Sequence, residues 1–428
     1  MMRSWFLVPC LVCNVLAMGS PVLAQTKAAP KSKAKAKANE SPRSTVAPKM
    51  KLGRLAPEEC VFFLTTEGWR TPPADSKNKS DQLWSVESLQ DFLQQLGDEI
   101  QKAIASQTEN DPNASIVASV APVFLTAALK HPLAISLVSF TIDANPEVSL
   151  AFVIDTETDL EKVREAFDQL ISLAKEKEPN SLVETTVEGA TFYSPSVPND
   201  EVKVLPQFGF YESYFVMTMG LDMTAKTIER IKGADQAPKW LDATLLNFKI
   251  ERPSMAWQIN VQEIWATVDS LIQDAQVRSA LEVSGVKAFK RIACAAGLNN
   301  VASIDRMIIE MDGPPAGVFA AFPDRPLVEA DFKGIPANPV QATVVCFDLA
   351  QLVESILAIA EKFEPAAREN FQAIAAQGEQ MLGFSVTEDL IASFGDVWSL
   401  YISGTEAGGG FIPGFVLSAG IKDQAKLE

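Results

Sequence analysis

The chain has 428 residues, 47% of them hydrophobic, and carries 37 basic and 54 acidic residues for a formal net charge of −17. This length and apolar content suffice for two or more folded domains. Residues 1–54 hold ten of the bases and one of the acids, which leaves a formal charge of −26 on residues 55–428. A body so acidic repels phosphate backbones, so we do not expect it to bind nucleic acid.

Residues 1–24 have the features of a secretory signal peptide. Arg3 provides a short charged start, an apolar centre follows, and Val22 and Ala24 are small residues at the positions a signal peptidase requires. The apolar run ends at Gly19, short of the roughly 20 residues that a membrane-spanning helix needs. The sequence therefore predicts an exported protein, located in the periplasm, the cell envelope or outside the cell.

Residues 25–54 are predicted to be a disordered basic linker. The segment consists mainly of Lys, Ala, Pro and Ser, has no apolar period, and contains nine basic residues against the single acid Glu40. One interpretation is a solvated tether for the folded part. The alternative is that this segment binds an anionic cell-envelope polymer or a membrane surface through its positive charge.

The remainder of the chain is predicted to form three modules, at residues 55–250, 251–333 and 334–428. Each starts with a proline and a strand, continues into a helix, and reaches a β-hairpin whose turn contains Gly, Pro or Asn. The fold class expected is α+β, with mostly antiparallel sheets that carry helices. The predicted hairpins lie at residues 134–155, 301–323 and 397–420.

An internal alignment supports the repeat. Residues 128–164 align with residues 392–428 without a gap, at a constant offset of 264 that matches Ser139 with Ser403 and Asp159 with Asp423. The apolar pattern agrees along the same stretch. The chain stops at Glu428, just inside the helix that should follow the third hairpin, so we expect a truncated or degenerate last module with exposed apolar surface.

The first module should also contain several local elements. Apolar residues at helical spacing predict a helix around 89–104 and another over 158–178, where Thr158 and Glu161 have the spacing of a capping box. Strands are expected around 184–193 and 208–219, and a short helix at 222–232. Residues 240–250 look like a linker or a bridging strand.

The later modules are shorter. In the second, a strand at 253–261 leads into a helix, and a further helix over 283–298 is expected to end at Gly297. In the third, the strand at 340–347 is followed by Asp348 as the cap of a helix that reaches Phe363.

Histidine limits the chemistry available to the chain. His131 is the only one, so paired-histidine metal sites cannot form, and a Ser/His or Cys/His mechanism would have to use this residue. It lies before Pro132 at the junction of a predicted helix and strand, which favours a position in a turn.

Two local patterns resemble functional motifs. Asp155, Glu157, Asp159 and Glu161 resemble the start of a calcium loop, but the glycine and the final carboxylate of an EF-hand are missing, and acids at a helix start are typical in any case. Ser172 and Lys175 have the S-x-x-K spacing of penicillin-recognising enzymes without their partner motifs.

Outside the signal peptide the chain has three cysteines, at Cys60, Cys294 and Cys346. Because each lies within an apolar pattern, we expect buried free thiols, with a single disulfide as the alternative. The aromatic residues at strand or helix positions are expected in the core: Phe62, Trp257, Trp265 and Trp398. We assign no catalytic, cofactor-binding or metal-binding residue and expect no cofactor.

The signal peptide, the polar spacer and the segments 284–313 and 382–404 together resemble a family of uncharacterised secreted bacterial proteins with strand-helix-hairpin modules. The resemblance implies an envelope or extracellular location and transfers no functional residue. The sequence thus favours an exported non-enzymatic protein that binds or scaffolds an envelope component. A hydrolase that uses a carboxylate pair and a carrier of lipid or apolar ligands are the alternatives.

Overall fold

A computed structural model describes residues 49–424, with gaps at 70–74, 143–146, 197–204, 234–236, 300–302, 324, 338–340 and 404–413 and only scattered residues between 90 and 111. The chain forms two compact units. Of the described residues, the first unit contains 49–267 and 291–309, and the second contains 268–290 and 310–424. The predicted signal peptide and residues 25–48 lie outside the described part, and the boundary between the units falls inside the predicted second module.

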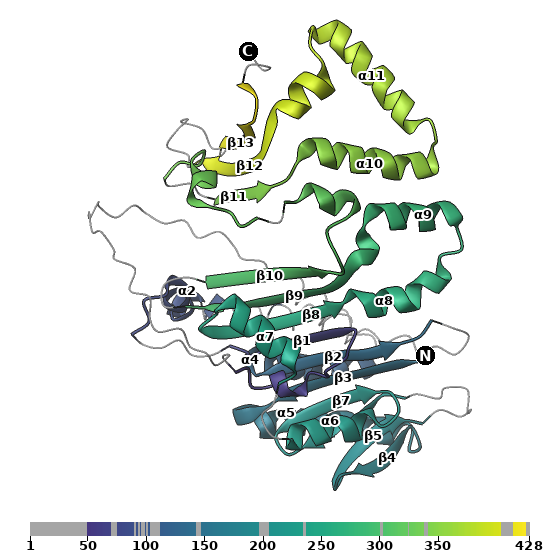
Figure 1. The fold of residues 1–428 in the computed structure, drawn as a ribbon. Helices are drawn as coiled ribbons and strands as arrows, with labels where there is room; N and C mark the ends of the chain where they lie inside the picture. The colour runs from purple at the N-terminus through teal and green to yellow at the C-terminus, as the bar shows by residue number, and fades with distance from the viewer. Residues whose placement is uncertain are drawn as a thin grey trace. The chain divides into compact units, whose positions relative to one another are not determined.

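The fold is α+β, as expected, and every strand pairing that is described is antiparallel. The first unit is built on a ten-stranded sheet of order β10-β9-β8-β1-β2-β3-β7-β6-β5-β4 (Figure 1). Its elements are η1 (Gly53–Leu55), β1 (Phe62–Thr66), α2 (Lys79–Trp84), α4 (Pro112–Lys130), β2 (Leu133–Phe140), β3 (Val148–Asp155), η2 (Glu157–Asp159), α5 (Leu160–Lys177), β4 (Leu182–Val187), β5 (Ala190–Pro195), β6 (Gln207–Tyr211), β7 (Tyr214–Met219), α6 (Met223–Lys232), α7 (Lys239–Phe248), β8 (Arg252–Asn260), α8 (Val261–Val268), β9 (Phe289–Leu298) and β10 (Ser303–Met311).

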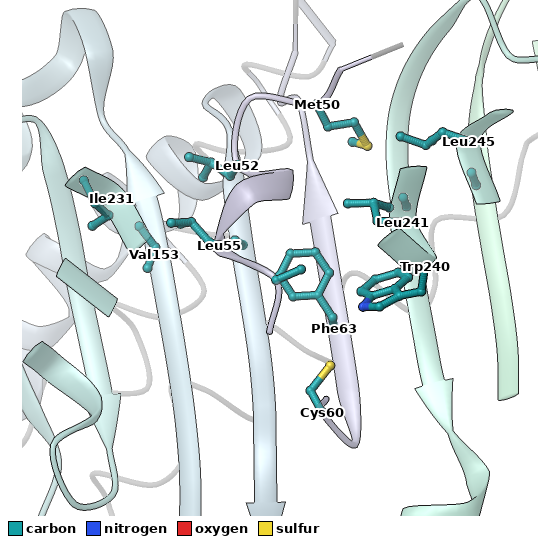
Figure 2. Packing of buried hydrophobic residues seen from close by; sticks show 14 of the residues in the cluster. Met50, Leu52, Leu55, Cys60, Phe63, Val153, Ile231, Trp240, Leu241 and Leu245 are labelled. Carbon is teal, nitrogen blue, oxygen red and sulfur yellow. The ribbon is translucent and has the colours of Figure 1, made fainter. Parts of the chain in front are cut away.

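Helices cover both faces of this sheet, because residues alternate between the two faces along each strand. Phe63 and Val153 point to one face and pack with η1, α6 and α7. Leu133 and Ile154 point to the other face and pack with α4 and α5. On the first face, Phe63 lies beside Trp240, with ring centroids 5.9 Å apart (Figure 2).

The second unit has a three-stranded sheet of order β11-β12-β13. Its elements are η3 (Asp269–Leu271), α9 (Ala275–Ser284), η4 (Val286–Ala288), η5 (Gly317–Ala321), η6 (Glu329–Phe332), β11 (Gln341–Cys346), α10 (Leu349–Phe363), α11 (Ala367–Leu382), the π-helical turn η7 (Val386–Leu390), η8 (Ile391–Ser393), β12 (Phe394–Ser403) and β13 (Gly414–Ile421). No helix among the described residues is long and apolar enough to cross a membrane.

Several local predictions are confirmed. The hairpin at 134–155 is β2 and β3, and the hairpin at 397–420 is β12 and β13. Asp348 caps α10 by accepting a hydrogen bond from the backbone N of Gln351 at 3.0 Å. The short helix at 222–232 is α6.

Two helix and strand predictions are wrong. Residues 289–298 form β9 instead of the end of a helix, because Ala293 and Ala295 alternate onto the core face and pair with β8. Residues 240–250 contain helix α7 instead of a linker or strand, with Trp240 and Leu245 on its buried side. The hairpin predicted at 301–323 is also wrong: its first strand is β10, which pairs with the preceding strand β9, and residues 317–321 form the 3₁₀ turn η5 instead of a second strand.

The capping box predicted at Thr158 is also absent. Helix α5 begins at Leu160, and Thr158 lies in the preceding turn η2. The residue at the cap position is Asp159, whose carboxylate makes no capping hydrogen bond because it contacts Lys130 and His131 instead.

Candidate functional site

Residues 49–56, which we call the strap, enter the core immediately after the basic segment. Met50, Leu52 and Leu55 are buried in the cluster that covers the first face of the sheet, and Leu52 is fully buried. Figure 2 shows Leu52 and Leu55 close to Val153. The predicted end of the linker at residue 54 is therefore wrong, and residues 50–54 belong to the folded body. The basic composition of the segment does not indicate this, because the burial involves only a few apolar side chains within it.

Lys51 anchors the strap through its charge. Its Nζ lies 2.8 Å from Oδ2 of Asp155 and also contacts Glu157. Its backbone N donates to Oε1 of Glu67 at 2.5 Å, and Glu67 is buried. Burial alone would lower the pKa of Lys51, but the hydrogen bonds to Asp155 and Glu157 raise the pKa above its ordinary value. The lysine is thus held in its charged form.

His131 lies in the short turn between α4 and β2, as expected, and is 2% exposed. Its Nε2 is 2.9 Å from Oδ2 of Asp159, and its Nδ1 is 3.4 Å from Oε2 of Glu157. The neighbouring Lys130 places its Nζ 2.8 Å from the same oxygen of Asp159. Hydrogen bonds from Lys130 lower the pKa of Asp159, and those from His131 act in the same direction.

We call this group the ionic cluster, and its members are Lys51, Lys130, His131, Asp155, Glu157 and Asp159. The carboxylates come from the end of β3 and the turn before α5, and the cations come from the strap and the end of α4. The cluster therefore ties three distant segments together. Asp155 has a further partner in Ser213. The Oγ of Ser213 donates a hydrogen bond of 2.9 Å to Oδ1 of Asp155.

Backbone geometry holds the cluster closely against β1. Gly68 has φ +68°, and a Cβ at this position would lie 2.4 Å from the carbonyl oxygen of Lys130. Trp69 N donates to that oxygen at 3.1 Å. Glu157 has φ +44°, a left-handed conformation that is unfavourable for a residue with a side chain. Its side chain contacts Lys51 and His131.

In the structure, three acids of the run at 155–161 form ion pairs. Asp155, Glu157 and Asp159 face lysines and a histidine, and the described part of the chain contains no group of three or more side chains placed to hold a metal ion. Sequence patterns could not indicate these partners, because they lie between 26 and 106 residues away along the chain.

The contacts of His131 hold the surrounding segments in place. They leave neither ring nitrogen free to act as a general base toward a nucleophile. Both ring nitrogens face carboxylates, Nδ1 that of Glu157 and Nε2 that of Asp159. A histidine that acts as a general base keeps one nitrogen free toward the hydroxyl or thiol it activates. The ionic cluster is therefore best described as a partly buried clasp between the strap and helices α4 and α5.

We expect replacement of Asp159 with Asn to lower the free energy of unfolding by about 1 kcal/mol at pH 7, a modest value because solvent partly screens this carboxylate. The pKa of Asp159 is lower in the folded chain than its ordinary value of 3.8. Its contribution is therefore complete above pH 3.8 and is lost as the pH falls through the lowered folded value. Urea unfolding at neutral pH and at a series of acidic pH values measures this loss.

The matched control is Asp168→Asn, on the exposed side of the same helix. It should change the stability by less than about 0.5 kcal/mol at any pH. Equal effects of the two substitutions, or a difference between Asp159→Asn and the wild type that grows in acid, would contradict the clasp.

The S-x-x-K pattern does not form a catalytic pair. Ser172 is exposed on α5, while Nζ of Lys175 contacts Glu184 and lies 5.1 Å from the ring centre of Tyr193. This lysine thus bridges α5 to β4 and β5.

The three cysteines at 60, 294 and 346 are free, which agrees with the expectation of free thiols. Cys60 is fully buried, and the other two are half-buried. Burial raises the pKa of each thiol. Such thiols are poor nucleophiles at neutral pH, so these positions are structural.

The aromatic residues predicted in the core, Phe62, Trp257, Trp265 and Trp398, are half-buried. Among the described residues of the sheet, the fully buried aromatic side chains are Phe63 on β1 and Phe192 on β5. In the second unit Trp398 stacks on Phe347, with ring centroids 5.0 Å apart and planes 14° apart.

A second charged group, missed by the sequence analysis, organises the smaller unit. Arg325 places Nε 2.9 Å from Oδ2 of Asp396 and Nη1 2.9 Å from Oδ2 of Asp331. These hydrogen bonds lower the pKa of both carboxyl groups. The arginine thereby fixes the loop before β11 to the start of β12, which is again a structural role.

Comparison with known proteins provides no relative from which to transfer a function. No protein-family description, curated protein or solved structure matches the chain. The resemblance to a family of secreted bacterial proteins therefore stays a prediction from sequence.

Proposed function

We propose that the chain is an exported, non-enzymatic protein of the cell envelope with a binding or scaffolding role. The observation that carries the proposal is the exposed apolar surface of the second unit. On α11, Ile374 is 69% and Met381 is 80% exposed, and no residue of this helix is buried. Large apolar side chains clustered on a surface mark a site of interaction with another molecule.

The charged groups support binding over catalysis. A hydrolase that uses a carboxylate pair needs one carboxylic acid with a raised pKa, so that it can donate a proton. Wherever the pKa of an Asp or Glu among the described residues is shifted, it is lowered, as at Asp81, Asp159, Glu188, Asp269, Asp331 and Asp396. These groups are suited to ion pairs.

The basic segment is the proposed contact with an anionic envelope polymer or a membrane surface. Because the strap begins at residue 49, the basic segment available for this role is 25–48, shorter than the predicted linker. Nucleic acid is not a partner in this proposal, since the body that follows is strongly acidic.

The test is co-sedimentation of residues 25–428 with purified cell-wall and membrane fractions, at low and moderate salt. We expect binding at low salt that weakens with salt, because the contact releases counterions. Deletion of residues 25–48 should abolish it without unfolding the body. A variant with Gln at Lys31, Lys33, Lys35 and Lys37 keeps the length of the segment and isolates its charge.

Other outcomes of the co-sedimentation experiment would contradict all or part of the proposal. Absence of co-sedimentation with every fraction would contradict an envelope-binding role. Binding that survives the deletion would place the contact on the folded units and remove residues 25–48 as its source. Release of soluble sugar from the cell-wall fraction during the incubation would support the hydrolase instead.

A further inference from the structure

Strand β13 is an open edge of the sheet in the second unit. Among the described residues, β12 is the one strand that pairs with it in that sheet. Natural proteins protect such edges with charged residues, proline or bulges, since the unpaired backbone groups otherwise recruit another strand. The sequence of β13, GFVLSAGI, has neither charge nor proline. Its register against β12 is continuous from Gly414 to Ala419, and the one irregularity in the pairing falls between Ala419 and Ile421, at the end of the strand. The strand is therefore an unprotected template for pairing.

One face of the same strand is apolar and exposed. Phe415, Leu417 and Ile421 alternate along β13 and so lie on one face, where they are 67%, 68% and 58% exposed. Leu400, opposite Leu417 on β12, extends this surface and is 45% exposed. The open edge and the exposed apolar face thus occur on one strand.

The first unit shows how a comparable strand is normally completed. Its β3 also follows β2 in a hairpin, but it pairs with β7 on the other side. Val153 on β3 is 1% exposed because the strap and α6 cover it. Among the described residues, no strand pairs with the second edge of β13, and no element packs on its exposed apolar face.

We propose that β13 pairs with β13 of a second copy of this chain, in antiparallel orientation about a two-fold axis. Antiparallel pairing of a strand with itself closes on two copies and satisfies the backbone groups of both edges. In a register centred on Ser418, Phe415 lies opposite Ile421 of the second copy and Leu417 lies opposite its Ala419. This self-association goes beyond the binding role proposed above and does not depend on it.

The distribution of charge makes β13 a better surface for contact with a second copy of the chain than α11. Because β13 carries no charge, self-pairing brings no like charges together. The apolar stripe of α11 lies among exposed Glu369 and Glu379, so contact of this helix with itself would oppose acids. The edge strand is therefore the better surface for a second copy.

The experiment is sedimentation velocity of residues 25–428 from about 1 to about 100 µM, with Leu417→Lys as the test variant. Leu417 is mostly exposed in the single chain, so its replacement should not change the thermal unfolding of that chain. Two lysines on neighbouring positions across the axis should weaken the dimer by at least roughly tenfold. The matched control is Met381→Lys, which places the same charge on α11 of the same unit and should leave the dimer unchanged.

A mixture tests the geometry independently. Leu417→Glu alone should be as monomeric as Leu417→Lys, but equal amounts of the two variants should form a mixed dimer, because the charges across the axis are then opposite. A wild-type chain that is monomeric up to about 100 µM overturns the proposal. So does a dimer that Leu417→Lys leaves intact, or one that Met381→Lys weakens equally.

Discussion

Replacing Leu52 with Ala should reduce the free energy of unfolding of the first unit by about 2–5 kcal/mol, the usual cost of removing a fully buried leucine side chain. Leu52 is fully buried beside Leu55 and Val153, although it lies within the stretch whose composition predicts a disordered linker. Urea unfolding followed by tryptophan fluorescence, to which the buried Trp240 contributes, measures the change. A cost of this size would establish that the fold begins at the strap.

The matched control is Lys49→Ala, three positions earlier in the chain. Lys49 is exposed, and its replacement should change the stability by less than about 0.5 kcal/mol. If Leu52→Ala behaves like Lys49→Ala, the strap is part of the linker and the anchoring role of Lys51 fails with it. The same pair of variants therefore tests both the apolar and the ionic attachment of this segment.

Gly68→Ala should be equally damaging, with a loss of about 4 kcal/mol that combines left-handed backbone strain with a steric clash. The added Cβ would lie 2.4 Å from the carbonyl oxygen of Lys130, and this backbone atom cannot move without displacing His131. Chemical unfolding gives the total cost. The chemical shifts of the single histidine ring report whether the ionic cluster is displaced.

Gly189→Ala separates the two contributions. Gly189 also has a positive φ, of +80°, but nothing lies within 4 Å of a Cβ at that position. Its replacement should therefore cost only the strain, about 1 kcal/mol, and should leave the histidine resonances unchanged. Equal costs for the two glycines would contradict the close packing of β1 against the ionic cluster.

These variants bear on function because the strap connects the basic segment to the centre of the first unit. The strap leads directly into β1, which lies between β8 and β2 in the interior of the sheet. If residues 25–48 hold the protein to an envelope surface, any tension on that attachment acts first on Leu52, Leu55 and Lys51.

The sequence by itself determined the elements whose signals are local. The α+β class, the hairpins of β2 with β3 and of β12 with β13, and the start of α10 at Asp348 follow from residue alternation, turn residues and a capping side chain. The helical spacing of α7 was also present, at Trp240, Leu241 and Leu245, and could have been recognised.

Only the tertiary structure decided the rest, because those features depend on partners distant in the chain. The alanines of β9 favour a helix by intrinsic propensity, and pairing with β8 overrides it. Residues 50–54 have the composition of a tether, yet Leu52 is buried in a cluster whose members come from as far along the chain as Ala295. The acids at 155–159 have the pattern of a helix start. In the structure they form the ionic cluster, because Lys51 contacts Asp155 and His131 contacts Asp159. Local patterns fix secondary structure, whereas burial and charge pairing are settled by which distant side chains meet.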